Sequence, residues 1–260
     1  MVVVGVILMA IAAVLLLIRQ NYQRRSFSVK SARPVQTASL TATAQAVAVE
    51  IGGGDWRDYV RLWGKIRCDE PLISELKQVP CVYYRYTVQR EYEETHRRQT
   101  SEGRWETTTQ RGSEILSSHQ QRVPFWLVDS SGTVEINPDG ADIETVEIVN
   151  DFQPGEPQGP LAFGRYRRDP GALAQSRRTL GYRYREAVLP LGRSVLVVGE
   201  ATDATGPVTL AKPDGRQYII SLKPYEMLAR RTDANAQRAF WGAMGCAAIG
   251  GLLMLLGWRS

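Results

Sequence analysis

Two long apolar runs, one near each end of the chain, constrain its fold more than any other feature. Residues 2–18 read VVVGVILMAIAAVLLLI, without a charged side chain. As a helix they would extend about 25 Å, just enough to cross the hydrocarbon core of a bilayer. Residues 239–258 (AFWGAMGCAAIGGLLMLLGW) have the length of a typical span and carry aromatic residues near their ends. The pattern predicts two transmembrane helices with a domain between them.

A secretory signal peptide is the alternative interpretation of the first run. Such a peptide has basic residues before its apolar stretch and a small-residue cleavage site soon after it. Here no basic residue precedes Val2, Arg19 follows the run directly, and the nearest Ala-x-Ala candidates lie at residues 42–48. These flanks favour a retained membrane anchor.

Basic residues cluster beside both runs. Those that precede the first acidic residue, Glu50, are Arg19, Arg24, Arg25, Lys30 and Arg33. Those that lead into the second run are Arg230, Arg231 and Arg238. Because Lys and Arg near span ends favour the cytosolic side, we predict a cytosolic middle domain with both termini on the opposite side. Residues 19–54 are expected to form a basic juxtamembrane connector that contacts the lipid bilayer.

The middle of the chain is electrically balanced. The chain has 32 basic and 27 acidic residues, and without the five basic residues of the connector 27 of each remain. A nucleic-acid-binding protein presents a basic stripe on its folded domain. The balance therefore argues against nucleic acid as a partner.

Residues 55–231 have the pattern of a mainly β domain. Residues 59–68 and 81–92 alternate apolar and polar side chains and are rich in β-formers. The DSSG sequence at residues 129–132 is a hairpin signal, because Gly132 can adopt a positive φ. We predict an antiparallel domain, built as an open barrel or sandwich and flanked by two transmembrane α-helices.

Residues 152–178 interrupt the strand pattern with prolines and arginines. A long loop inside a compact domain is often functional or disordered. Its arginines and aromatic rings suit an acidic peptide or lipid headgroups, so we identify as candidate partner-binding residues Phe163, Arg165, Tyr166, Arg167, Arg168, Arg177 and Arg178. The alternative is a disordered surface insertion whose arginines serve solubility.

Little in the sequence favours catalysis or a bound metal. The Cys and His residues outside the second run are Cys68, Cys81, His96 and His119, and no two of them have the close spacing of a zinc knuckle. With two histidines, both in polar stretches, Cys–His catalysis has little support. We predict no catalytic residue, no metal and no cofactor.

The second run has small residues at every fourth position, at Gly242, Cys246 and Gly250. Such a row lets another helix approach closely. That helix could be the first span, or it could belong to another copy of the chain, in which case the row would mediate self-association.

Several short motifs, taken in order, resemble one known family. They are VPCVYY at residues 79–84, Trp105, FWLVD at 125–129 with Gly132, NPDGA at 137–141 and EAVLPLG at 186–192, followed by Val195, Val197, Gly199, Glu200 and Ala201. Together they resemble the GIDE or "beside a membrane" (BAM) domain, here as a member of prokaryotic type. That domain occurs in mitochondrial membrane-anchored ubiquitin and SUMO ligases and in many bacterial and archaeal proteins.

The resemblance implies a β-rich domain held beside a bilayer, together with an E3 ubiquitin ligase label. Ligase activity in this family belongs to a separate C-terminal RING, which needs about eight zinc-binding Cys or His residues. This chain has three Cys and two His, and it ends at Ser260, soon after the second run. We therefore expect a non-catalytic interaction or scaffolding module that binds a protein or peptide. The alternative is ubiquitin-protein transfer, which rests on the family label.

Overall fold

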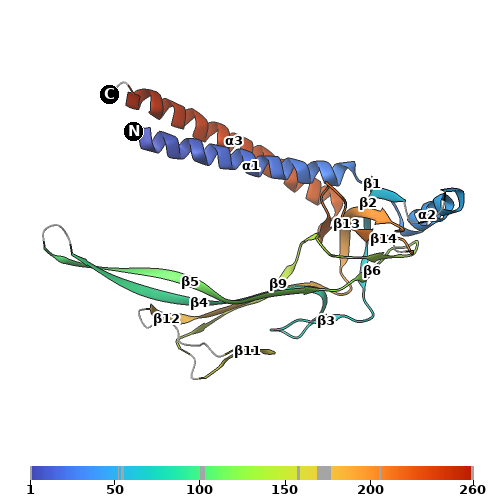
Figure 1. The fold of residues 1–260 in the computed structure, drawn as a ribbon, viewed down its shortest axis with the longest axis horizontal. Helices are drawn as coiled ribbons and strands as arrows, with labels where there is room; N and C mark the ends of the chain where they lie inside the picture. Colours follow the sequence, from blue (N-terminus) through green and yellow to red (C-terminus); the bar gives the residue numbers. More distant parts are fainter. Residues whose placement is uncertain are drawn as a thin grey trace. The chain divides into compact units, whose positions relative to one another are not determined.

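The computed structural model describes residues 2–51, 53, 56–99, 103–156, 159–168, 177–204 and 206–258 (Figure 1). They fall into two compact units that interleave along the chain. Unit 1 comprises Met1–Lys65, Leu127–Asp142 and Ser194–Ser260, and unit 2 comprises Ile66–Trp126 and Ile143–Arg193. Strands dominate between the terminal helices, so the prediction of a mainly β fold is confirmed.

Unit 1 combines three helices with an eight-stranded sheet. The helices are α1 (Val2–Ser31), α2 (Thr37–Ile51) and α3 (Tyr225–Trp258). The strands of the sheet are β1 (Arg33–Pro34), β2 (Arg57–Arg67), β6 (Phe125–Val128), β7 (Thr133–Ile136), β8 (Asp142–Ile143), β13 (Ser194–Thr202), β14 (Thr209–Ala211) and β15 (Ile219–Ser221). Because β2 pairs with both β6 and β13, strands β2, β6, β7, β14 and β13 close into a barrel-like ring. Most pairings are antiparallel, but β1 with β2 and β7 with β14 are parallel.

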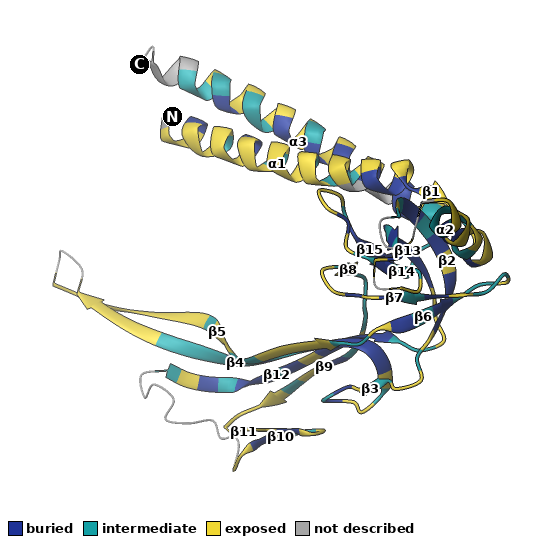
Figure 2. Cartoon of the chain, turned by 45° about the vertical axis from the view of Figure 1, so that its right-hand side comes forward, coloured by how far each residue is buried: buried dark blue, intermediate teal, exposed yellow. Residues whose placement is uncertain are grey.

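Strand β13 is buried on both of its faces, which its run of valines and leucine suits. Leu196 and Val198 on one face join a core cluster with Ile219. The same cluster contains Val29 from the end of α1 and Leu228 from the start of α3. The apolar contacts therefore anchor both helices in the β-sheet of unit 1, as the dark blue strands at the base of the helices indicate (Figure 2).

Helices α1 and α3 form an antiparallel pair, with the two chain ends at the same end of the pair (Figure 1). A Cβ added to Gly250 would lie 3.1 Å from the Gly5 carbonyl oxygen, and one on Gly242 would lie 3.4 Å from the Leu15 side chain. Two members of the small-residue row of α3, Gly242 and Gly250, thus lie against α1 of the same chain. Helix α1 continues to Ser31, well past the predicted boundary at residue 18.

Two membrane-spanning helices were predicted, but the described residues contain one that meets the criteria for a span. Of the helices in the described residues, one, over Val3–Ser31, is long and apolar enough to cross a membrane by length and composition. Within the described residues, α3 (Tyr225–Trp258) does not meet the same criteria.

Helix α2 begins at a cap supplied by the β6–β7 turn. The Asp129 carboxylate accepts hydrogen bonds from the Thr37 backbone N–H (2.9 Å) and hydroxyl (2.6 Å), and the Ser131 hydroxyl accepts one from the Ala38 N–H (3.0 Å). These groups satisfy donors that a helix N-terminus leaves free. The DSSG signal therefore forms a turn, and it also fixes a helix.

Unit 2 is built on a second sheet, of five strands. Its strands are β3 (Leu72–Ile73), β4 (Pro80–Gln99), β5 (Trp105–Arg122), β9 (Val146–Pro154) and β12 (Arg177–Pro190). They run in the order β3-β4-β12-β9, with β5 also paired to β4. A separate hairpin of β10 (Leu161–Phe163) and β11 (Tyr166–Arg168) packs against one face.

The core of unit 2 is rich in tyrosine. Tyr182 and Tyr184 on β12 lie opposite Arg90 and Val88 on β4, and all four are buried. Leu161 and Tyr166 from the hairpin complete the same cluster. Alternating residues of β4 and β12 therefore form an inner, aromatic face, and the residues between them form an outer face.

Candidate functional site

Most of the described residues in the predicted partner-binding segment, 152–178, lie in strands. It includes the end of β9, the β10–β11 hairpin and the first residues of β12. Residues 157–158 and 169–176 of this segment lie outside the described residues. Strands β10 and β11 have three residues each. Strands this short cannot show an alternation of apolar and polar residues, so the sequence did not predict them.

The two aromatic candidates point into the core. The Phe163 ring stacks on Tyr184 with ring centroids 4.9 Å apart, and the Tyr166 ring meets Tyr86 edge-on at 5.8 Å. Tyr166 is 4% exposed, so its ring offers no surface to a partner. Burial raises the pKa of Tyr166 above its ordinary value, because the phenolate would be poorly solvated there.

The arginine candidates stay at the surface but divide between two places. Arg165, Arg167 and Arg168 lie on the hairpin, where the Arg167 guanidinium donates to the Gly164 carbonyl (3.1 Å) and that of Arg168 donates to the Leu116 carbonyl. Arg177 and Arg178 lie at the start of β12, beside β4. The structure therefore brings three of these arginines together on the hairpin, and the other two belong to a charged network on the sheet.

That network joins glutamates of β4 to arginines of the neighbouring strands. Arg183 donates to Glu91 (2.6 Å), Arg111 to Glu93 (3.2 Å) and Arg177 to Glu94 (3.2 Å). The guanidinium of Arg178 lies 4.0 Å from the Glu93 carboxylate. Each pair joins residues that are opposite or diagonal in the strand register, so the sheet itself sets the partners.

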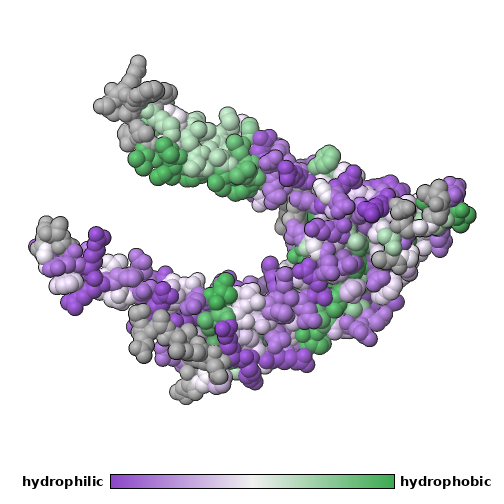
Figure 3. Space-filling model, viewed as in Figure 1, coloured by the Kyte–Doolittle hydropathy of each residue, from purple (hydrophilic) through white to green (hydrophobic). Residues whose placement is uncertain are grey.

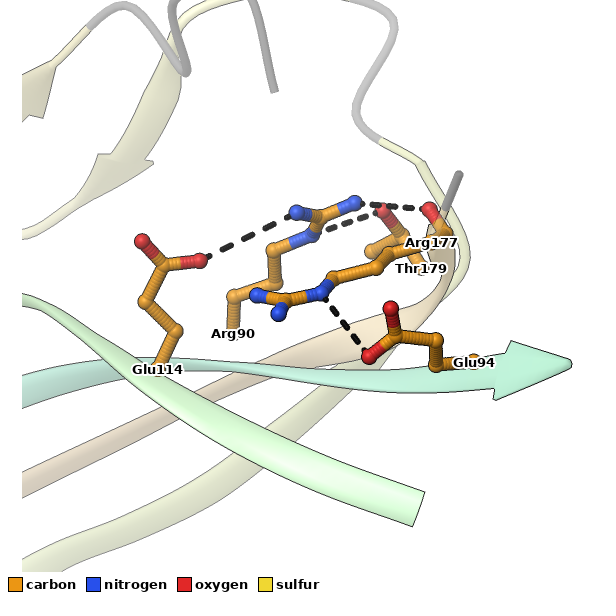
Figure 4. Close-up of polar contacts among 5 residues, drawn as sticks. All are labelled: Arg90, Glu94, Glu114, Arg177 and Thr179. Carbon is orange, nitrogen blue, oxygen red and sulfur yellow. Dashed lines mark hydrogen bonds and ion pairs between the residues drawn. The ribbon is translucent and has the colours of Figure 1, made fainter. Parts of the chain in front are cut away.

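Arg90 is the buried member of this region and was missed by sequence reasoning (Figure 4). Its side chain is 2% exposed; its Nε donates to the Thr179 hydroxyl (3.0 Å) and its Nη2 to the Arg177 carbonyl (2.9 Å). Glu114 approaches the remaining nitrogen at 3.9 Å. The one signal in the sequence was that Arg90 lies two residues after Val88, so that both side chains point to the same, buried face of β4.

Glu186 on β12 is a second buried charge, 1% exposed. Its carboxylate accepts hydrogen bonds from the Leu76 N–H (2.7 Å), the Lys77 N–H (2.9 Å) and the Ser74 hydroxyl (3.1 Å). It thereby holds the turn in which Gln78 adopts a φ of 59°. Glu186 satisfies backbone donors of this turn, which is a structural task.

The cysteines and histidines do not gather into one site. Cys81 and His96 lie near opposite ends of β4. At a rise of about 3.3 Å per residue, they are roughly 50 Å apart along the strand. His119 on β5 lies opposite Tyr86. Burial, together with the nearby charge of Glu186, raises the pKa of the Cys81 thiol to about 12, so this thiol is protonated at neutral pH. Among the described residues no group of three or more His, Cys, Asp or Glu side chains could hold a metal ion.

Comparison with known proteins identifies the family. The family model GIDE, described as E3 ubiquitin ligase, matches residues 92–256, from the middle of β4 into α3. A curated relative from Arabidopsis thaliana, named E3 ubiquitin-protein ligase SPL1, is 24% identical over 198 residues, which cover 74% of this chain and 53% of the relative. The chain thus spans about half the length of that relative. No solved structure matches. Since the family model covers more than half of its residues, the chain belongs to the GIDE family.

Proposed function

We propose that this chain is a two-pass membrane protein whose β-rich part acts at the cytosolic membrane surface as a non-catalytic scaffold for a protein partner. The observation that carries the membrane part is the apolar outer surface of the α1–α3 pair, seen as the green area over the two helices (Figure 3). Large apolar side chains exposed on α1 include Val3, Val4, Val6, Ile7, Ile11, Val14, Leu16 and Leu17, and those on α3 include Trp241, Met244, Ile249 and Leu252. A water-exposed surface of this kind would be unfavourable.

The packing of the two helices supports α3 as a second span over residues 239–258. Its apolar part lies beside the apolar part of α1, with Gly250 against Gly5 and Gly242 against Leu15. Both helices become polar at the same level, where the Arg19 guanidinium lies 4.5 Å from the centre of the Phe240 ring. Two helices with matched apolar lengths would cross the same hydrocarbon layer together.

The orientation proposed is a cytosolic β-rich part with both termini on the far side, from the basic residues that flank the apolar runs. Ser130 is exposed in the β6–β7 turn and does not take part in the α2 cap, so it is a suitable reporter. In a variant with its three cysteines replaced by serine, Ser130→Cys should resist a membrane-impermeant maleimide in intact cells and react after lysis. Labelling of intact cells would contradict this orientation.

The non-catalytic role is supported by the small number of possible zinc ligands, three Cys and two His in the whole sequence. The alternative, ubiquitin-protein transfer, is favoured by the description of the family and by the name of the Arabidopsis relative. Purified protein incubated with E1, a panel of E2 enzymes, ubiquitin and ATP should form no ubiquitin chains and should contain no stoichiometric zinc. Chain formation that requires this protein would establish the alternative.

The exposed arginines of the β10–β11 hairpin are the proposed contact for the partner. Deleting residues 152–178 would also remove Leu161 and Tyr166 from the core, so point substitutions are the sharper test. Arg165→Glu with Arg167→Glu should abolish recovery of a crosslinked partner and leave thermal unfolding nearly unchanged. Arg193→Glu, at an exposed position outside the hairpin, is the matched control. Equal recovery from both variants would remove the hairpin from the proposal.

A further inference from the structure

A polar groove of about 790 Å³ lies over the sheet of unit 2 and spans four of its strands. The residues that line it are Glu147 on β9, Arg185, Glu186 and Ala187 on β12, Arg85 and Thr87 on β4, and Ser118, His119 and Gln120 on β5. None of them belongs to the hairpin that carries the arginines discussed above. The groove is therefore a separate surface.

Strand register places two arginines side by side in this groove. Arg85 on β4 lies opposite Ala187, and Arg185 on β12 lies opposite Thr87, so the two arginines are diagonal neighbours. Both are exposed, whereas the adjacent Tyr84 and Tyr184 are buried, so both arginines project from the outer face. Diagonal neighbours across antiparallel strands are about 7–8 Å apart, a distance over which two long side chains can act on one ligand.

Among the described residues, these two arginines differ from Arg111, Arg177 and Arg183 of the same sheet in having no carboxylate partner. Arg111, Arg177 and Arg183 each donate to a glutamate of β4. Within the described part of the chain, neither the Arg85 nor the Arg185 guanidinium group makes a hydrogen bond or an ion pair.

Among the described residues, neither acid that lines the groove forms an ion pair with Arg85 or Arg185. Glu147 accepts a hydrogen bond from the Asn150 side chain (3.1 Å), and Glu186 is held by the turn at Ser74, Leu76 and Lys77. The two guanidinium groups therefore retain their full capacity for an external anion.

We propose that this groove binds an acidic segment of a partner protein in extended conformation, with its carboxylates on Arg85 and Arg185. Residues two apart in an extended peptide repeat at about 7 Å, which matches the separation of diagonal neighbours in the sheet. Each guanidinium can bind a carboxylate through two parallel hydrogen bonds. The Ser118 hydroxyl and the Gln120 amide, at exposed positions of β5, supply further donors beside the arginines.

A peptide fits this groove better than a nucleic acid. A polyanion would require a continuous basic stripe, but the groove has two arginines with Glu147 beside them. Two positive charges at strand-like spacing instead match a short acidic motif with carboxylates at alternate positions. This inference concerns a second surface, so it can fail while the proposed role of the hairpin arginines stands.

The test uses the full chain in nanodiscs of phosphatidylcholine and a short fluorescein-labelled peptide with glutamates at alternate positions. Fluorescence anisotropy should show saturable binding that weakens as salt is raised. Arg85→Gln with Arg185→Gln should weaken binding about tenfold or more, because charge-assisted hydrogen bonds are lost. The matched control, Arg111→Gln with Arg178→Gln, removes two exposed arginines that already face Glu93 and should leave the affinity unchanged.

Three results would overturn the inference. One is equal affinity of the double variant and the control pair, and another is equal binding of a peptide with glutamine in place of glutamate. The third is displacement of the peptide by inorganic phosphate, or by vesicles containing phosphatidylserine, at lower concentrations than by unlabelled peptide. That last result would assign the groove to phosphate groups. Unchanged thermal unfolding of both double variants ensures that the comparison concerns binding.

Discussion

Unit 1 and unit 2 are both rich in β-strands, yet different side chains build their cores. In unit 1 the core cluster that anchors the helices is mainly aliphatic, and Tyr59 is its one aromatic buried member. Its members are Val29, Ala32, Tyr59, Leu196, Val198, Ile219 and Leu228. In unit 2 the core contains Tyr166, Tyr182 and Tyr184, and two charged side chains, Arg90 and Glu186, are buried beside them.

The difference follows from the contacts that each core makes. The core of unit 1 packs against two helices, and the core of unit 2 fixes a strand register and a turn. Aliphatic packing is non-directional, so it suits the broad contact between a sheet and two helix ends. Buried charged groups must find their partners, so they fix one register and one turn geometry. On the outer surface of unit 2, Arg177 and Arg183 pair with glutamates of β4, whereas Arg85 and Arg185 have no carboxylate partner among the described residues.

The largest expected loss of stability comes from a substitution in the mainly aliphatic cluster of unit 1. Ile219 is fully buried, and Ile219→Ala should lower the free energy of unfolding by about 3–4 kcal/mol, through lost transfer energy and a cavity. Chemical denaturation gives the size of the loss, and hydrogen exchange of unit 1 amides gives its place. Val49→Ala on α2, where the side chain is 87% exposed, should change stability by less than about 0.5 kcal/mol. Similar losses in the two variants would contradict the role of the cluster.

The next effect tests the polar core of unit 2. Glu186→Gln keeps the shape of the side chain but places an amide NH2 against the donors of the 74–77 turn. The cost should be about 2–3 kcal/mol, because buried donors lose their acceptor. Hydrogen exchange should locate the loss in unit 2 and leave β13 protected. Glu147→Gln, at an exposed position of the same sheet, is the control and should be nearly neutral.

A third prediction concerns how the stability of unit 1 depends on pH, through the carboxylate of Asp129. Partial burial opposes ionisation of Asp129, but hydrogen bonds from Thr37 and Ser131 outweigh it and lower the pKa from its ordinary value of 3.8 to about 2. Because the folded-state pKa is depressed, the stabilisation is present above the ordinary value and is lost as the pH falls towards 2. The loss should be roughly 2 kcal/mol. It should appear as faster exchange of α2 amides, and Asp129→Asn should abolish this pH dependence.

The smallest effect concerns the polar contacts at the base of the helix pair. Hydrogen bonds from the Lys30 ammonium (2.7 Å) and the Ser26 hydroxyl (2.6 Å) lower the pKa of Asp233. Both charged side chains are about half exposed, so Asp233→Asn should cost only about 0.2–1 kcal/mol. Thermal unfolding in nanodiscs measures it. A loss larger than that of Ile219→Ala would mean that polar contacts, and not the aliphatic cluster, hold the helices.

Local features of the sequence determined several elements correctly. The alternation at residues 59–68 and 81–92 became β2 and most of the core-forming part of β4, and the DSSG sequence became the β6–β7 turn. Alternation reports which side of a strand is buried, and a turn depends on four consecutive residues, so neither requires knowledge of distant partners. The first apolar run likewise became a helix suited to a membrane.

Tertiary structure alone decided which side chains meet. The sequence could not show that Tyr166 would pack against Tyr86, that Arg90 would lie inside the sheet, or that Asp129 would cap a helix about ninety residues earlier. It also could not separate Arg85 and Arg185, which lack a carboxylate among the described residues, from arginines such as Arg183 that have one. Register between strands far apart in the chain sets these pairings, and a shift of one residue would place every side chain on the opposite face.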